Sequence, residues 1–121
     1  MKILVCDDEV MMLKAVEFKL KRDGYDVIVA TNGRDASDII KNDNTISLVI
    51  TDLLMPFFNG LELINLIKNE LKRDLPIMVL SKIGLEDTVL KAFELGADDY
   101  MVKPFSVNEL TIRAKKLLMS R

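Results

Sequence analysis

The sequence predicts an α/β fold of three layers, in which helices cover both faces of a parallel sheet. Short apolar runs of the kind that form strands alternate five times with stretches whose apolar residues recur at helical spacing. Most of these runs are nearly continuous, as expected for strands that are buried on both faces. The connections are only a few residues long, and strict alternation of strands and helices requires right-handed crossovers between parallel strands.

Five segments have strand character, and most end at polar or turn-forming residues. The segment that ends at Asp52 is the most informative, because it begins with the apolar run Leu48-Val49-Ile50, ends on one carboxylate and is followed by Pro56 and Gly60. A run of this kind is typical of a strand deep inside a sheet. In chain order the predicted strands are Lys2–Cys6, Tyr25–Ala30, Leu48–Asp52, Pro76–Leu80 and Tyr100–Val102.

The helices are predicted from apolar residues spaced three or four apart, bounded by capping and breaking residues. Asp23 and Gly24 end the first helix, Asn32 and Gly33 precede the second, and Ser106 caps the last. The predicted inward-facing residues are, helix by helix, Leu13, Val16 and Leu20; Ala36, Ile39 and Ile40; Ile64, Ile67 and Leu71; Val89, Ala92, Phe93 and Gly96; and Leu110, Ala114, Leu117 and Leu118.

Composition narrows the class of protein. The chain of 121 residues is 50% hydrophobic and 30% charged, which is typical of one globular domain, so we expect residues 1–121 to form a single domain without an output domain. No apolar run approaches the roughly 20 residues of a membrane helix, and no leader pattern is present, so we expect a cytoplasmic chain without a membrane partner. A net charge of −2 gives no general attraction to nucleic acid.

The scarcity of histidine and cysteine excludes several chemistries. The sequence has no histidine, so it has no histidine catalyst and no histidine phosphate carrier. Its one cysteine, Cys6, lies in an apolar run, cannot form an internal disulfide and argues against a zinc site. The chemistry must therefore come from carboxylates, hydroxyls, lysine or the backbone.

Polar side chains follow four of the predicted strands. Asp7 and Asp8 follow the first strand, Asp52 ends the third, Ser81 follows the fourth and Lys103 the fifth. In a parallel sheet these strand ends share one edge, which is where such sheets bind ligands. Two carboxylates ~5 Å apart repel by roughly 3 kcal/mol at an effective dielectric constant of ~20, so three of them need a cation. A hard divalent ion, above all Mg²⁺, fits this donor set.

A metal beside a carboxylate and a lysine indicates acceptance of a phosphoryl group. Asp52 would be the nucleophile, Lys103 would offset charge on the transferred oxygens, and Ser81 would donate a hydrogen bond to one of them. Two simpler interpretations stay open. Asp52 caps the following turn, as aspartate often does, or the acids are solvated loop residues beside an incidental lysine.

Four stretches carry a family resemblance: Lys2 to Glu9, Asp52 to Gly60, Leu80-Ser81 and Gly96 to Phe105. In their order and spacing they resemble the receiver domain of bacterial two-component response regulators, over essentially the whole chain. The resemblance implies a flavodoxin-like, CheY-like sheet with strand order 2-1-3-4-5. It also implies that a sensor histidine kinase or phosphotransfer protein passes a phosphoryl group from its phosphohistidine to Asp52.

The resemblance assigns roles to the residues at the sheet edge. Lys103 would contact the phosphate, and its peptide bond to Pro104 is expected to be cis. The Mg²⁺ ligands that it implies are Asp8, Asp52, the backbone carbonyl of Leu54 and, through water, Asp7.

The family's switch maps onto two further residues. Ser81 matches the hydroxyl that moves toward the phosphate, and Tyr100 matches the aromatic residue that then turns inward. The surface from Asp87 to Lys116 would change shape and recognise partners. Taken without the resemblance, Tyr100 is better interpreted as a half-buried strand residue with its hydroxyl in water.

The stretches Gly96 to Phe105 and Glu109 to Arg113 resemble receivers of the winged-helix OmpR/PhoB-type subfamily. Such receivers form homodimers through the fourth helix, fifth strand and fifth helix, and regulate a DNA-binding output domain that would lie outside this chain. Asp99 and Arg113 match one charge pair of that dimer. Glu109 matches half of another, without a basic residue at the partner position.

Three other functions are less compatible with these residues. An aspartate-nucleophile phosphatase needs a second aspartate two residues after the nucleophile, where this chain has Leu54. A flavin-binding protein of similar fold needs a phosphate loop after the first strand, where Asp7 and Asp8 repel phosphate. An inactive receiver-like scaffold would not need every site residue.

Leu54 and Lys82 lie beside the site and predict slow self-dephosphorylation. The pair Phe57-Phe58 either covers its loop or faces a partner.

Overall fold

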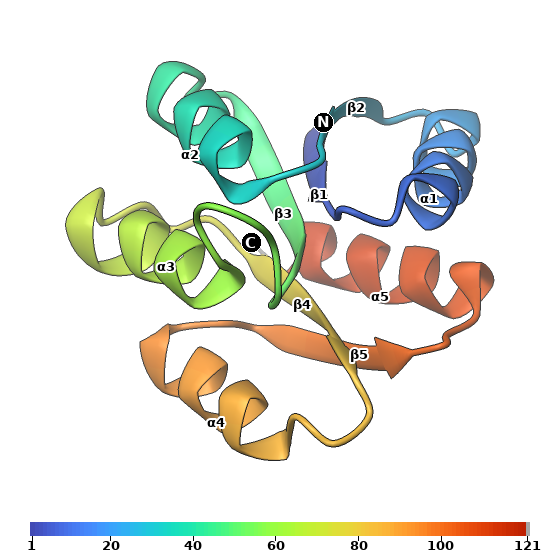
Figure 1. The fold of residues 1–121 in the computed structure, drawn as a ribbon. Coiled ribbons are helices and arrows are strands. Elements are labelled where there is room, and N and C mark those ends of the chain that lie inside the picture. The colour runs from blue at the N-terminus through green and yellow to red at the C-terminus, as the bar shows by residue number, and fades with distance from the viewer. Residues whose placement is uncertain (121) are drawn as a thin grey trace.

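A computed structural model describes residues 1–120, which form a five-stranded parallel sheet with the order β2-β1-β3-β4-β5 (Figure 1). This confirms the predicted doubly wound architecture and its strand order. The strands are β1 (Lys2–Cys6), β2 (Asp26–Ala30), β3 (Ile46–Asp52), β4 (Ile77–Lys82) and β5 (Asp99–Lys103).

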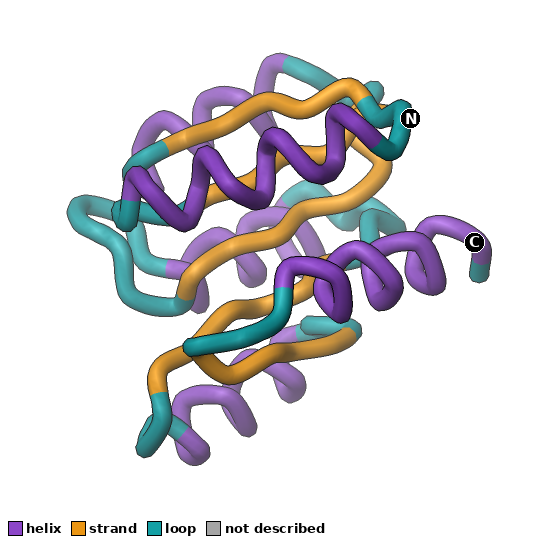
Figure 2. The backbone as a smooth tube through the Cα atoms, turned by 90° about the vertical axis from the view of Figure 1, so that its right-hand side faces the viewer, coloured by secondary structure: helices purple, strands orange, loops and turns teal. Residues whose placement is uncertain are grey.

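Helices cover both faces of this sheet. The helical segments are α1 (Val10–Arg22), α2 (Gly33–Asn42), α3 (Gly60–Asn65), the π-helical turn η1 (Leu66–Glu70), α4 (Glu86–Leu95) and α5 (Val107–Met119). Helices α1 and α5 share one face and lie in front of the strands in Figure 2, while α2, α3 and α4 cover the other. None of the helices in residues 1–120 has the length and apolar character that crossing a membrane requires.

The core consists of two apolar clusters, one on each side of the sheet. Strand β3 contributes to both, since Leu48 and Ile50 pack toward α1 and α5 while Val49 packs toward α2 and α3. All three side chains are fully buried. Burying a side chain of this size contributes roughly 1.5–3 kcal/mol. Strand β3 is therefore central and held firmly from both sides, which fixes the position of Asp52 at its end.

Side-chain caps set where three helices begin. The side chains of Asn32, Asn59 and Ser106 each accept a hydrogen bond from the backbone N–H three residues later. Asn59 also forms a reciprocal capping box with Glu62. Such a cap satisfies N–H groups that have no partner inside the helix. The predicted cap at Ser106 is confirmed.

Two of the residues that the sequence predicts to face inward do not do so in the structure. Leu71 lies beyond η1 and is half exposed, because the π-helical turn rotates the chain out of the spacing that the pattern assumed. Phe93 on α4 is 38% exposed and packs edge-on against Tyr100 rather than into the core. Gly96, in contrast, ends α4 as predicted, with a φ of 122° that favours glycine.

Candidate functional site

The carboxyl ends of the parallel strands bring the predicted polar residues together. Asp52 and Lys103 are the last residues of β3 and β5, and Asp7 directly follows β1. The N–H of Asp7 donates to the carbonyl of Ala30 at 3.1 Å, which fixes Asp7 against the end of β2. Sheet register pairs Asp52 with Leu80, so Ser81 lies one step further along β4.

The three aspartates form a tight cluster. One carboxylate oxygen from each of Asp7, Asp8 and Asp52 lies within 4.8 Å of the other two. Asp7 is fully buried and Asp52 is 3% exposed, whereas Asp8 is exposed. The first two acids therefore meet where water cannot fully solvate them, and the third opens the cluster to solvent.

Lys103 lies among these acids. Its Nζ is 2.8 Å from Oδ2 of Asp7, 3.3 Å from Oδ2 of Asp52 and 3.2 Å from Oε1 of Glu9, and its side chain is only 9% exposed. The contact with Asp7 is close but poorly aligned, so that buried Oδ2 lacks a well-formed hydrogen bond within residues 1–120. Three carboxylates thus share one ammonium group, with Asp8 beside two of them, and the site keeps an excess of negative charge.

Burial dominates the ionisation of the two inner acids. Loss of water raises the pKa of Asp7 and Asp52 above the usual range for aspartate, although hydrogen bonds and the charge of Lys103 act in the opposite direction. Burial alone would lower the pKa of Lys103, but its contacts with Asp7, Asp52 and Glu9 outweigh burial and raise it. The lysine is therefore held in its charged form.

The loop after β3 folds back onto the end of the strand. The N–H of Leu54 donates to Oδ1 of Asp52 at 3.4 Å, and the N–H of Gly60 donates to the carbonyl of Leu53 at 2.9 Å. A Cβ atom on Gly60 would lie 2.4 Å from the carbonyl oxygen of Asp52, so only glycine allows α3 to start this close to the site. The side chain of Leu54 is 48% exposed.

The residues matched to the switch lie on neighbouring strands. Ser81 is 1% exposed, whereas Tyr100 is 39% exposed. The ring of Tyr100 meets that of Phe93 edge-on, with centroids 5.7 Å apart. In this structure Tyr100 therefore lies at the surface, as the residue pattern without the family resemblance favours.

The peptide bond between Lys103 and Pro104 is cis.

The charged residues matched to a dimer interface pair within the chain. Arg113 contacts Oδ1 of Asp99 at 3.1 Å and Oε1 of Glu109 at 3.1 Å. Arg113 also donates to the carbonyl of Tyr100 at 3.0 Å. This network joins α5 to β5 in a single copy of the protein.

Sequence reasoning missed two contributors to the site. Glu9 contacts Lys103, but the run of three acids gave no sign that its side chain reaches a lysine 94 positions away. The need for glycine at position 60 follows from a close approach of backbone to backbone, which appears only in three dimensions. The two residues of the pair Phe57-Phe58 differ in burial, since Phe58 packs on the core and Phe57 is 74% exposed.

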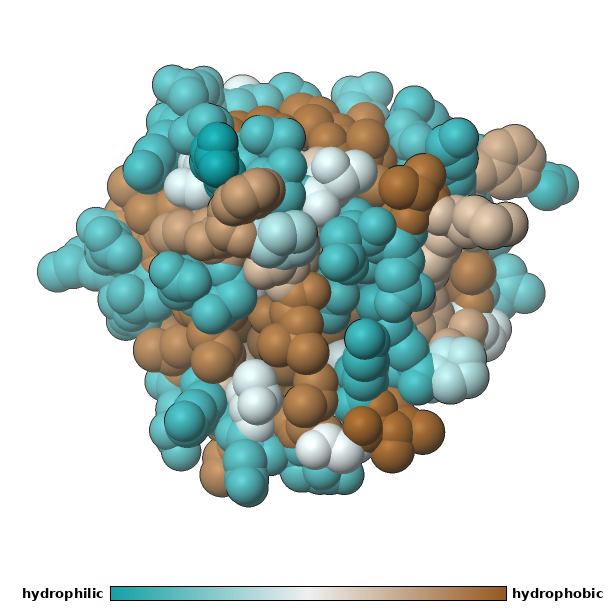
Figure 3. All heavy atoms as spheres, in the orientation of Figure 1, coloured by the Kyte–Doolittle hydropathy of each residue, from teal (hydrophilic) through white to brown (hydrophobic). Residues whose placement is uncertain are grey.

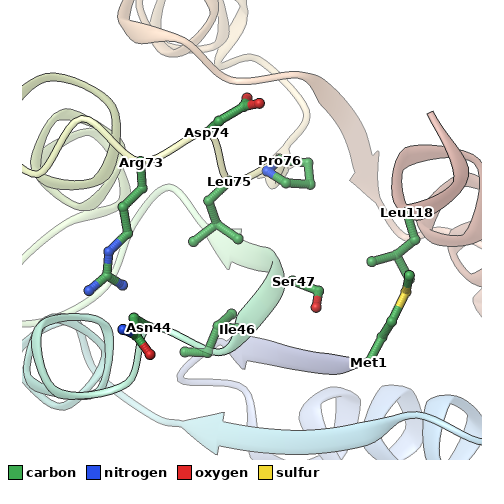
Figure 4. Close-up of a pocket in the computed structure, with 9 residues that line it drawn as sticks. All are labelled: Met1, Asn44, Ile46, Ser47, Arg73, Asp74, Leu75, Pro76 and Leu118. Carbon is green, nitrogen blue, oxygen red and sulfur yellow. The ribbon is translucent and has the colours of Figure 1, made fainter. Parts of the chain in front are cut away.

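A cavity of about 440 Å³ lies at the other end of the strands, opposite the aspartates. Figure 4 shows Arg73 and Asn44 at one end of this cavity and Met1 and Leu118 at the other. It lies at the amino ends of the strands, away from the aspartates and Lys103, and brings together none of the acids described above. The face in Figure 3 shows several separate groups of hydrophobic residues among hydrophilic ones. The charge cluster, rather than this cavity, marks the site.

Comparison with known proteins agrees with this geometry. The family described as "Response regulator receiver domain" matches residues 3–115. The receiver domain of a Francisella response regulator is 29% identical, with a TM-score of 0.89 over 98% of this chain and 97% of that one. A Chloroflexus aurantiacus structure described as a putative response regulator is 33% identical, with a TM-score of 0.86 over 98% and 97% of the two chains. Full-length FixJ from B. japonicum is 26% identical, with a TM-score of 0.88, and this chain covers 57% of it.

Proposed function

The chain belongs to the response regulator receiver family of two-component signalling, and from this premise we propose that it is a switch controlled by phosphorylation of Asp52. The observation that carries the proposal is the position of Asp52. Its carboxylate lies at the carboxyl end of the central strand, 3.3 Å from the ammonium of Lys103 and beside Asp7 and Asp8. The proposed donor is a phosphohistidine of a sensor kinase or phosphotransfer protein.

The acidic cluster fits a magnesium ion. Three carboxylate oxygens lie within 4.8 Å of one another, and a buried oxygen of Asp7 lacks a well-formed hydrogen bond within residues 1–120. Hard oxygen donors of this kind suit Mg²⁺, which keeps several of its waters. Asp8, Asp52 and the carbonyl of Leu54 would hold the ion, and Asp7 would act through water. When bound, it would neutralise charge on the phosphoryl oxygens and align them with Asp52.

The proposed transfer uses Asp52 as the nucleophile, with Lys103 and Ser81 contacting the transferred group. A carboxylate oxygen of Asp52 attacks phosphorus, the P–N bond of the phosphohistidine breaks, and its electron pair returns to the imidazole. The product is an acyl phosphate on Asp52. Lys103 moves from the carboxylate to the new phosphoryl oxygens, which carry more charge, and Ser81 donates a hydrogen bond to one of them.

The readout is proposed to be a change in the surface formed by α4, β5 and α5. Ser81 is buried beside the site while Tyr100 lies exposed, so movement of the hydroxyl would open space for the ring. We propose that this surface controls a partner, a homodimer or an output domain outside this chain, of the DNA-binding winged-helix type. The intrachain pairing of Arg113 with Asp99 means that such a dimer would have to exchange these partners.

The alternative of a phosphatase is less favoured by this site. Position 54, where that class places a general acid, holds a leucine whose side chain is 48% exposed. The proposed role is that of a cytoplasmic regulatory domain that promotes only its own phosphorylation and dephosphorylation. An inactive scaffold would leave the buried charges of Asp7, Asp52 and Lys103 without a use.

Intact mass spectrometry tests the proposal. The protein is incubated with Mg²⁺ and acetyl phosphate, beside the variants Asp52→Asn and Asp38→Asn, the second being a matched change on the exposed face of α2. We expect an added mass of about 80 Da, one phosphoryl group, on the wild type and on Asp38→Asn but not on Asp52→Asn. An adduct on all three would place the acceptor elsewhere, and none on the wild type would refute phosphoacceptance.

A further inference from the structure

We propose that Gly33, the first residue of α2, is a positioning residue for the site, because it sets where the loop between β3 and α3 lies. This loop carries Leu54, two residues after Asp52. The proposal rests on the function proposed above, but it concerns a residue outside the acidic cluster, in a different segment of the chain.

The backbone of the loop packs directly on Gly33. The N–H of Gly33 donates to the carbonyl of Pro56 at 3.3 Å. A Cβ atom on Gly33 would lie 1.4 Å from the carbonyl oxygen of Phe58 and 2.3 Å from its carbonyl carbon. The constraint is one of space, since ordinary contact for a Cβ atom begins at 3.4 Å, and the loop would have to move by about 2 Å to admit a methyl group. The neighbour is backbone, so no side chain can rotate away.

Two further contacts hold the same loop. The guanidinium of Arg34 lies 4.5 Å from the centroid of the Phe57 ring. Phe57 has a φ of 73°, a left-handed conformation that a bulky residue adopts only when its surroundings hold it there. Phe58 packs against the apolar cluster under α2 and α3. The start of α2 therefore braces residues 56–58 from one side.

The loop carries this placement to the site. At its other end the N–H of Leu54 donates to Oδ1 of Asp52, and Gly60 donates to the carbonyl of Leu53. The carbonyl of Pro56, which accepts the hydrogen bond from Gly33, is two residues from Leu54, and only Met55, Pro56 and Phe57 separate Phe58 from Leu54. A displacement of about 2 Å at Phe58 is thus carried over a short segment to Leu54, whose carbonyl is a proposed Mg²⁺ ligand.

The test compares Gly33→Ala with Ile40→Val. Ile40 is fully buried on the same helix, so its truncation lowers stability without adding volume near the loop. The first readout is the set of backbone amide chemical shifts in EDTA, and we expect residues 52–60 to shift in Gly33→Ala and to stay in place in Ile40→Val. The second is Mg²⁺ affinity from titrations of the folded proteins. We expect at least ten-fold weaker binding for Gly33→Ala and less than a two-fold change for Ile40→Val.

Unchanged amide shifts of residues 52–60 in Gly33→Ala would overturn the proposal, and so would an equal loss of affinity in both variants. If Gly33→Ala does not fold, Arg34→Gln replaces it, because it removes the contact with Phe57 without adding volume. Its expected effect is a shift of Phe57 and Phe58, and no shift would also overturn the proposal. Should the wild type bind no Mg²⁺, the proposed function fails, while the shifts in EDTA still decide the role of Gly33.

Discussion

Replacing Lys103 with methionine removes the one ammonium group within residues 1–120 that contacts the inner acids and keeps a side chain of similar length. At an effective dielectric constant of ~20, the attraction of Nζ is about 6 kcal/mol to Asp7 at 2.8 Å and about 5 kcal/mol to Asp52 at 3.3 Å. The free-energy cost of desolvating the ammonium offsets several kcal/mol of this attraction. In the variant, two buried carboxylates are left facing each other without a counter-charge.

We therefore expect Lys103→Met to lower the free energy of unfolding by about 3–5 kcal/mol in EDTA, as is usual when one partner of a buried ion pair is removed. For a domain whose total stability is roughly 5–15 kcal/mol this is a large loss. Mg²⁺ should recover part of it. A wild-type gain of about 2.7 kcal/mol is expected at a concentration 100 times the Kd, and the variant should gain more, because no lysine competes with the ion for the acids.

Urea denaturation, followed by circular dichroism in EDTA and in Mg²⁺, measures both quantities. The matched control is Lys82→Met, the same substitution at an exposed lysine that ends the neighbouring strand β4. It should change stability by less than about 0.5 kcal/mol in either condition. The reasoning fails if Lys103→Met is as stable as the control in EDTA, or if Mg²⁺ stabilises it less than the wild type.

Three further predictions concern single groups. Burial, together with the charge of Asp7, raises the pKa of the fully buried Cys6 thiol, so it should not react with iodoacetamide at pH 8 until urea unfolds the chain; mass spectrometry would detect rapid native labelling as a contradiction. The pKa of Asp43 is lowered by its hydrogen bonds with Lys2 and Thr45, so its contribution is present above the unfolded pKa of about 3.9 and is lost as the pH falls below it. Accordingly, Lys2→Met should lose less stability than the wild type between pH 5 and pH 2 in acid titrations, and equal losses would refute that assignment. Finally, since Leu54 offers no polar side chain to orient water, phosphorylated Asp52 should persist for minutes or longer by intact mass, and a lifetime of seconds would contradict this.

The features that the sequence predicts well are those that depend on periodicity and on strand direction. Strand β3 is central because its run Leu48-Val49-Ile50 is apolar on both faces, and the structure buries these three side chains fully. The meeting of Asp7, Asp52 and Lys103 follows from the parallel arrangement alone, since all three lie at strand ends of the same sense. No knowledge of side-chain contacts is needed for either conclusion.

The features that sequence reasoning missed depend on contacts between distant segments or on irregular backbone. The π-helical turn η1 moves Leu71 off the predicted face, and no local pattern announces such a turn. The contact of Glu9 with Lys103 spans 94 positions, and the intrachain pairing of Arg113 with Asp99 joins two elements whose residues the family resemblance matches to a dimer. In each case the deciding quantity is a distance in space.

The same charge imbalance links the stability of the domain to its proposed function. Raised pKa values for Asp7 and Asp52 mean that burial makes their ionised forms less favourable here than in water, so keeping them ionised costs folding free energy. Lys103 offsets part of that cost, but the single ammonium cannot balance the carboxylates around it. Any cation that binds the folded state alone must then stabilise it. A phosphoryl group on Asp52 would add negative charge to the same cluster, and would draw Lys103 and Ser81 toward itself. The free-energy cost of burying these charges is therefore also the reason why a cation or phosphoryl group bound there would act on the neighbouring strands β4 and β5.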